Sequence, residues 1–200
     1  MSATATELAV WLFAGPAASE DRAEADLVAR ARRGDPSAFE EIVRRHQARV
    51  YNLAYRMLRQ REEAEDIAQE AFLKALAALP SLREPGALGA WLARITASLC
   101  LSRLRSPSRR REVAVEHPVA EGPDAEAREF VSSVRAAVAR LPHHYRLAIV
   151  CFYLEGRSYE EAARIAGVGV RTLKTRLYRA RVLLRGLLAD ALGREMEAEG

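Results

Sequence analysis

The residues of this sequence that could do chemistry are concentrated in one short basic segment near the C-terminal end. Between residues 171 and 185 the segment has no acidic residue and six cations, which are Arg171, Lys174, Arg176, Arg179, Arg181 and Arg185. A solvated helix usually mixes charges of both signs, because opposite charges four residues apart attract and like charges repel. Uncompensated positive charge at helical spacing therefore predicts a polyanionic partner, such as the phosphates of nucleic acid.

The residues before this segment predict how it is positioned. Residues 159–166 read as a short helix capped by Ser158, with Glu161 three residues later, and "GVG" then makes a tight turn before a longer helix from Val170. This order is the helix-turn-helix signature of DNA-binding proteins. The side chains expected to pack the two helices together are Ala162, Ala163, Ile165, Val168, Val170, Leu173 and Leu177.

The other side of the longer helix is the candidate DNA-binding face. In a major groove, Arg and Lys can bridge guanine acceptors, and Thr can reach bases or phosphates. The candidate residues are Arg171, Thr172, Lys174, Thr175, Arg176 and Arg179. A merely solvated amphipathic helix and a membrane-surface helix are the alternatives, but neither requires the cap, the turn and the short preceding helix.

Helical periodicity continues through the rest of the chain, and no segment alternates as a strand does. The sequence predicts an all-α fold of two small helical domains joined by a flexible linker, the second containing the helix-turn-helix. A first helix is expected to start at Asp35-Pro36-Ser37, with apolar residues recurring at helical spacing as far as Leu58. The other expected helices span about 62–79, 90–105, 127–140, 143–155, 159–166 and 170–189, with a loop at 82–89. The expected divisions are an N-terminal extension (1–25), a first domain (26–105), a linker rich in Pro, Gly and charge (106–125), a second domain (126–190) and a tail (191–200).

Composition excludes several classes of function. Half of the 200 residues are hydrophobic and 29% are charged, as in globular proteins, and the net charge is +4. Cys100 and Cys151 lie in separate apolar runs, which indicates free thiols in a reducing cytoplasm and no metal site. The apolar stretch Leu8–Gly15 is too short to span a bilayer, so we expect a cytoplasmic protein without membrane insertion. No phosphate-binding loop, nucleophile elbow or zinc-protease motif occurs, so we expect no catalytic residues, no cofactor and no small-molecule substrate.

Two long stretches resemble bacterial sigma factors of the extracytoplasmic-function (ECF) group. "ARLPHHYRLAIVCFYLEGRSYEEAARIAGVGVRTLKTRLYRARVLLRGLL" (139–188) is similar to the promoter-binding C-terminal domain of that group. "DPSAFEEIVRRHQARVYNLAYRMLRQREEAEDIAQEAFLKALAAL" (35–79), followed by "AWLARITASLCLSRLRS" (90–106), resembles its first domain. The resemblance implies that the basic helix contacts the minus-thirty-five promoter element. Arg171 departs from the family pattern, in which a small residue is usual near the start of this helix.

The resemblance also implies two sites in the first domain. A helix that docks on core RNA polymerase would use acidic residues around apolar anchors; its residues are Glu65, Asp66, Ile67, Gln69, Glu70 and Phe72, with Ile67 and Phe72 as the anchors. The segment that opens and reads the minus-ten element would follow, and its residues are Trp91, Arg94, Ser98, Arg103 and Arg105. Ser98 and Ser102 depart from the family pattern, in which Asn and Asp are common there.

The leading hypothesis is therefore a sigma factor that binds core RNA polymerase, directs it to specific promoters and helps to open the DNA at initiation. Its expected partners are core RNA polymerase, promoter DNA and an anti-sigma factor. A stand-alone helix-turn-helix regulator that needs no polymerase is the alternative, although such a protein would have no use for the acidic docking helix. A polymerase-binding decoy that has lost the ability to open DNA is a third interpretation, based on Ser98 and Ser102.

Overall fold

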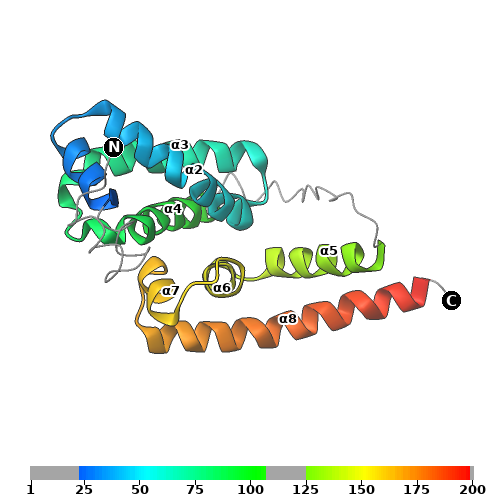
Figure 1. The fold of residues 1–200 in the computed structure, drawn as a ribbon. Coiled ribbons are helices and arrows are strands. Elements are labelled where there is room, and N and C mark those ends of the chain that lie inside the picture. Colours follow the sequence, from blue (N-terminus) through cyan, green and yellow to red (C-terminus); the bar gives the residue numbers. More distant parts are fainter. Residues whose placement is uncertain (1–22, 107–124, 199–200) are drawn as a thin grey trace, which may run out of the picture.

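The structure, a computed structural model, describes residues 23–106 and 125–198 and shows only helices, short turns and loops within them (Figure 1). The all-α prediction is confirmed. No helix among these residues is long and apolar enough to cross a membrane. Most of the expected linker, the N-terminal extension up to residue 22 and the last two residues lie outside the described residues.

The helices before the expected linker form what we call the N-terminal group (residues 23–106). After a helix over residues 23–32, its elements are α2 (Pro36–Leu58), α3 (Arg61–Ala78), the 3-10 turns η1 (Leu79–Ser81) and η2 (Pro85–Ala87), and α4 (Leu88–Arg105). The predicted helices in this part are confirmed to within two residues. The expected loop at 82–89 contains η2 and the first residues of α4.

Local sequence explains where α2 begins and ends. The carboxylate of Asp35 accepts hydrogen bonds from the backbone N–H of Ser37 (3.0 Å) and from the Ser37 hydroxyl (2.7 Å), and it forms an ion pair with Arg30 (2.8 Å). These contacts, first the Ser37 side chain and then Arg30, lower the pKa of Asp35 to about 2. At the other end Arg59 adopts a left-handed conformation (φ 62°), which stops the helix and turns the chain toward α3.

The helices after the expected linker form the C-terminal group (residues 125–198). Its elements are α5 (Ala125–Arg140), α6 (His143–Ile149), the π-helical turn η4 (Val150–Leu154), α7 (Tyr159–Ile165) and α8 (Val170–Ala198). The helix expected at 143–155 changes from α to π at Val150, where the N–H of Glu155 bonds the Val150 carbonyl (2.9 Å). The last helix is longer than expected and continues to Ala198.

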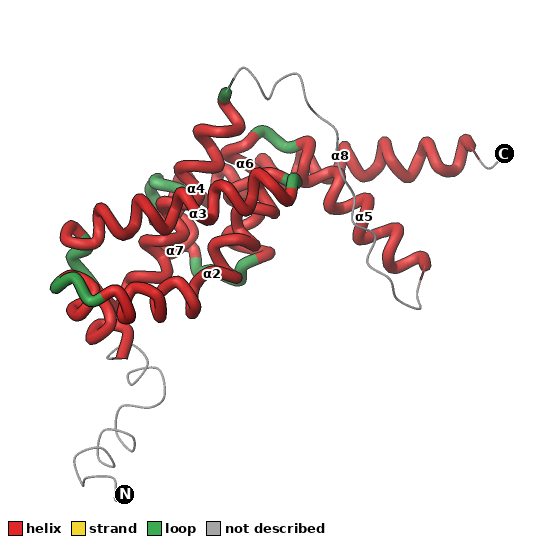
Figure 2. Tube along the Cα trace, turned by 90° about the horizontal axis from the view of Figure 1, so that it is seen from above, coloured by secondary structure: helices red, strands yellow, loops and turns green. Residues whose placement is uncertain are grey.

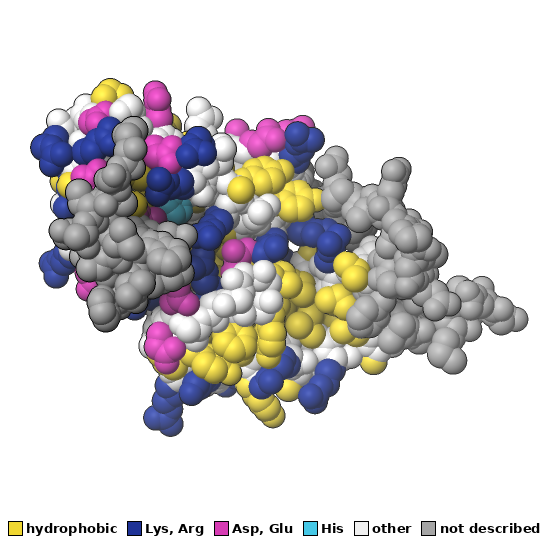
Figure 3. All heavy atoms as spheres, in the orientation of Figure 1, with side chains coloured by type: hydrophobic (Ala, Val, Ile, Leu, Met, Phe, Trp, Pro, Cys, Tyr) yellow, Lys and Arg dark blue, Asp and Glu magenta, His cyan; other side chains and the backbone are white. Residues whose placement is uncertain are grey.

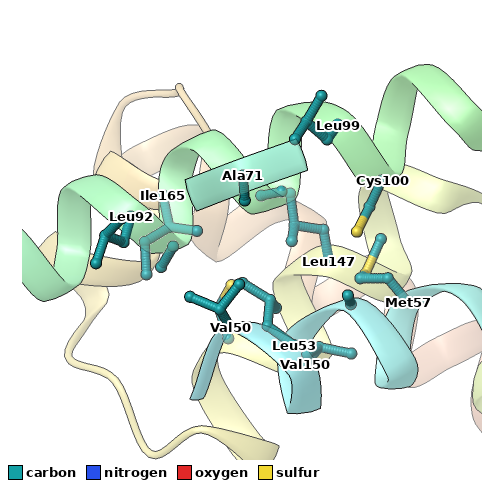
Figure 4. Close-up of a cluster of buried hydrophobic side chains, with 14 of the residues drawn as sticks. Val50, Leu53, Met57, Ala71, Leu92, Leu99, Cys100, Leu147, Val150 and Ile165 are labelled. Atoms are coloured by element: carbon teal, nitrogen blue, oxygen red, sulfur yellow. The ribbon is translucent and has the colours of Figure 1, made fainter. Parts of the chain in front are cut away.

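The two groups pack against each other along a shared apolar core. Helices α6 and α7 contact α4, and α6 and η4 contact α2. Figure 4 shows Met57 and Cys100 of the N-terminal group beside Leu147 of α6, and Leu92 of α4 beside Ile165 of α7. All five side chains are buried. Figure 2 shows the C-terminal part of α8 projecting away from the remaining helices. The sequence predicted two domains but not this packing between them.

Candidate nucleic-acid interface

The predicted helix-turn-helix is present as α7, a short turn and α8. Ser158 and Glu161 form a capping box at the start of α7: the Ser158 hydroxyl accepts from the Glu161 N–H (3.1 Å), and the Glu161 carboxylate accepts from the Ser158 N–H (3.0 Å). The hydrogen bond from the Ser158 backbone leads the contacts that lower the pKa of Glu161. At the other end Gly167 takes a positive φ of 63°, which a side chain would resist. Neighbouring residues in the sequence therefore determine where α7 begins and where the turn before α8 forms.

One side of α8 is buried against α6 and α7, and the other side is open. Leu173 and Leu177 are buried together with Ala162, Ala163 and Ile165, and Val168 and Val170 pack against the same core, as predicted. Among the six predicted DNA-contacting residues, Arg176 is half-buried and the others are exposed; these others are Arg171, Thr172, Lys174, Thr175 and Arg179. Figure 3 shows basic side chains spaced along the lower edge of the molecule, where α8 runs in Figure 1.

Neighbouring aromatic and polar groups hold part of this face in place. The Lys174 ammonium lies 4.9 Å from the centre of the Tyr159 ring, which stacks on Phe152 with ring centres 4.4 Å apart. The Thr175 hydroxyl donates to the Arg171 carbonyl (3.1 Å). It must leave that carbonyl in order to donate a hydrogen bond to DNA.

Arg176 lies at the edge of the face, near the start of α6. Burial and then the positive charge of Arg176 lower the pKa of His144. Because the ordinary pKa of a histidine is already near 6.5, this lowering favours the neutral form of His144 at pH 7.

A second candidate face lies on α4. Trp91, Arg94, Ser98 and Arg105 are spaced by three, four and seven residues, which places them on one stripe of the helix. Arg94, Ser98 and Arg105 are exposed, while Trp91 is half-buried and packs against the core. Ser102 is exposed on the same stripe.

Arg103 does not share this stripe with the others. It is half-buried on another side of α4, where its guanidinium lies 3.6 Å from the Glu63 carboxylate of α3. The structure therefore brings together four of the five residues predicted for the minus-ten element and assigns Arg103 to the contact between α4 and α3.

The third candidate face is the acidic side of α3, and here two predicted residues need correction. Glu65, Asp66 and Gln69 are exposed, and Glu70 is half-buried in an ion pair with Lys74 (2.9 Å). Ile67, however, is 1% exposed, so it is not available to a docking partner.

Phe72 is likewise core, at 9% exposure. The large apolar residues that α3 exposes are Leu73 (62%) and Leu76 (47%), close to the acidic residues on the same side. Sequence reasoning missed them because it did not follow the phase of the helix: residues 64, 67, 71, 72 and 75 form one buried side, and positions 73 and 76 fall outside it.

The described residues give little evidence of metal binding or of thiol chemistry. No cluster of three or more His, Cys, Asp or Glu side chains in residues 23–106 and 125–198 could hold a metal ion. Both cysteines are buried and neither forms a disulfide bond, and burial raises the pKa of Cys151 to about 12, which makes it a poor nucleophile.

Comparison with known proteins gives a consistent family assignment. The family described as Sigma-70 region 2 matches residues 42–111, and the family described as Sigma-70, region 4 matches residues 132–184. The ECF RNA polymerase sigma factor SigM of Mycobacterium tuberculosis is 37% identical over 171 residues, which cover 84% of this chain and 86% of SigM. The ECF RNA polymerase sigma factor SigE of Mycolicibacterium smegmatis is 36% identical over 167 residues, which cover 78% of this chain and 65% of SigE.

A solved structure has a similar fold. The sigma factor RpoE from Bartonella quintana, crystallised in complex with the anti-sigma factor NepR, matches with a TM-score of 0.59 and 29% sequence identity. The match covers 76% of this chain and 96% of the RpoE chain.

Proposed function

This chain belongs to the ECF group of RNA polymerase sigma factors, and we propose that each of its three exposed faces performs one part of the function of such a factor. A sigma factor binds core RNA polymerase, directs it to specific promoters and helps to open the DNA at initiation. Its role is regulatory, so we assign no catalytic residue to this chain. We place its action in the cytoplasm, together with core polymerase.

The exposed face of α8 is our candidate for contacting the minus-thirty-five element. Arg171, Thr172 and Lys174 lie near the N-terminus of α8, which is the part of a recognition helix that meets base edges. Arg179, two turns further along, is suited to a phosphate contact. This outward basic face on a capped helix-turn-helix is the single observation that carries the proposal.

The stripe on α4 is our candidate for the minus-ten element. Opening DNA requires an unstacked base to be held, and a ring beside cations can do this by stacking and by contacts to the backbone. The half-buried Trp91 supplies the ring, and the exposed Arg94 and Arg105 supply the cations. Ser98 and Ser102 lie between these cations and offer hydroxyl groups to the same strand.

The acidic face of α3 is our candidate for docking on core polymerase. Exposed leucines next to carboxylates fit an interface with an apolar centre and a charged rim. Leu73 and Leu76 take the anchoring role in this proposal in place of Ile67 and Phe72. We also propose an anti-sigma factor as a partner, because RpoE of B. quintana was crystallised with one.

Run-off transcription tests this function directly. Purified core RNA polymerase is mixed with genomic promoter fragments from the same source, with or without this protein. Specific transcripts that depend on the protein are the expected result. Polymerase binding without transcripts would contradict the proposed opening of DNA and favour a decoy, and DNA binding without polymerase binding would indicate a stand-alone regulator.

A further inference from the structure

A polar cavity lies where α2, the start of α4 and α7 meet, and none of its lining residues belongs to the three faces assigned above. Its volume is about 720 Å³, which is within the usual range of small-molecule sites. Four arginines line it: Arg45 and Arg49 of α2, Arg157 just before α7, and Arg164 within α7. Arginine binds carboxylate and phosphate groups through paired N–H donors, so this lining favours an anionic ligand.

Three of these arginines have donors that the described residues do not use. The Nε of Arg157 is buried and has no acceptor among them, while its Nη1 lies 3.7 Å from the Glu161 carboxylate. The side chains of Arg49 and Arg164 are exposed, and neither makes a hydrogen bond or an ion pair with another described residue. A buried donor without an acceptor costs free energy that a ligand oxygen would recover. Three arginines with unused donors match the three terminal oxygens of a phosphate group better than the two of a carboxylate.

Three carboxylates also line the cavity, and they restrict what the rest of the ligand can be. Glu24 is bonded to the buried His46 (2.9 Å), and Glu161 takes part in the capping box of α7. Glu84 is exposed, and its side chain has no partner among the described residues. A carboxylate accepts hydrogen bonds from hydroxyl groups and repels a second anion. The ligand should therefore combine an anionic group with hydroxyl groups.

The walls of the cavity offer no exposed ring for stacking and no room for an apolar tail. Apart from the buried His46, the uncharged lining residues are Gly86, Ala87, Gly89 and Ala90. A neighbouring cavity shares His46, Arg49 and Arg157 with the first, but its volume is about 20 Å³, which holds about one water molecule. A nucleobase or an acyl chain would therefore meet no matching surface, whereas a small molecule with phosphate and hydroxyl groups would.

We propose that this cavity binds a sugar phosphate, whose phosphate group is held by Arg49, Arg157 and Arg164 and whose hydroxyl groups face Glu84. The site goes beyond the proposed function and does not depend on it, because binding needs neither DNA nor polymerase. The lining residues come from both the N-terminal and the C-terminal group, so the bound ligand contacts both and stabilises the folded chain by mass action. The chain would then respond directly to the concentration of a phosphorylated carbohydrate.

Isothermal titration calorimetry of the full chain tests this site. The probes are glucose 6-phosphate, ribose 5-phosphate and fructose 1,6-bisphosphate, and glucose and inorganic phosphate each supply one half of the chemistry. We expect at least one sugar phosphate to bind about tenfold or more tightly than glucose or inorganic phosphate. The same compound should raise Tm by about 5–10 °C when its concentration is about 100 times Kd. The proposal would be overturned if no sugar phosphate bound at millimolar concentration, or if inorganic phosphate bound as tightly as the best of them.

Single variants locate the binding in this cavity. Arg49→Ala and Arg164→Ala each remove an exposed guanidinium, and each should weaken the binding of the tightest probe by about tenfold or more, as the loss of a hydrogen bond to a charged group implies. Arg33→Ala and Arg61→Ala make the same charge change at exposed positions outside the cavity, and they should bind as the unmodified chain does. Circular dichroism confirms that each variant is folded. Unchanged affinity in both cavity variants, or an equal loss in the controls, would contradict the site.

Glu84→Ala distinguishes recognition of the sugar from recognition of the phosphate. It removes an acceptor for hydroxyl groups, so it should weaken the binding of the sugar phosphate and not that of inorganic phosphate. An equal effect on both probes would overturn the role of Glu84 and the assignment of a sugar. A failed transcription assay with intact binding of the sugar phosphate would contradict the proposed function and leave this site standing.

Discussion

Removing two cations from the exposed face of α8 should reduce the salt dependence of DNA binding by a predictable amount. Lys174 and Arg179 are both exposed there and lie in the predicted contact set. Each phosphate contact that is lost lowers the slope of log affinity against log salt by about 0.9, so the pair accounts for about 1.8. Between about 50 and 200 mM salt, a fourfold change, the variant should lose about 12-fold less affinity than the wild type does.

Fluorescence anisotropy with a labelled duplex of mixed sequence measures this slope. The full chain can be used, because the face of α8 is open in the described arrangement and counterion release does not depend on base sequence. The matched control replaces Arg44 and Arg61 with Ala, which makes the same change in net charge at exposed positions of α2 and α3.

The comparison of the two double variants decides the prediction. The control should keep the wild-type slope, because Arg44 and Arg61 pair with glutamates on their own helices. An unchanged slope for Lys174→Ala/Arg179→Ala would refute the placement of phosphates along α8. An equal loss in both double variants would show that net charge, and not this face, attracts the DNA.

Three further predictions concern the cap of α7, the exposed and buried sides of α3, and the start of α2. Ser158→Ala removes the cap of α7 and should cost about 1 kcal/mol of stability in urea unfolding, while the cations of α8 stay in place. Leu73→Asp should weaken capture of core polymerase in a pull-down and leave the unfolding free energy within about 0.5 kcal/mol, whereas Ile67→Ala should cost about 2–4 kcal/mol. The pKa of Asp35 is about 2 in the folded chain and near 4 when unfolded, so its stabilising effect should be lost as the pH falls from about 4 to 2. Asp35→Asn should therefore flatten the acid side of a plot of Tm against pH.

The fold and the helix-turn-helix could be predicted because their signals are local. A capping serine, a glycine that takes a positive φ and a period of three to four residues each act within one or two turns of the chain. The same locality explains the success for α2, where Asp35 and Pro36 mark the start. Charge at helical spacing then predicted which side of α8 is exposed.

The anchors of α3 were predictable in principle and were assigned wrongly. Ile67 and Phe72 are its bulkiest apolar residues in the acidic stretch, but size does not decide which side a residue faces. Ala64 and Ala71 are buried on the same side as Ile67, and following them around the helix would have identified Leu73 as an outward residue. The positions of the alanines around the helix therefore indicate which side of α3 is buried.

The packing between the groups could not be predicted by such means. Arg146 and Met57 are 89 residues apart, and the residues next to either position do not indicate that the two are in contact. Apolar periodicity in α6 and α7 shows that one side of each helix must be buried, but a core within the C-terminal group would satisfy the same pattern. The buried contact between the two groups depends on their shapes and on side chains that are distant in sequence.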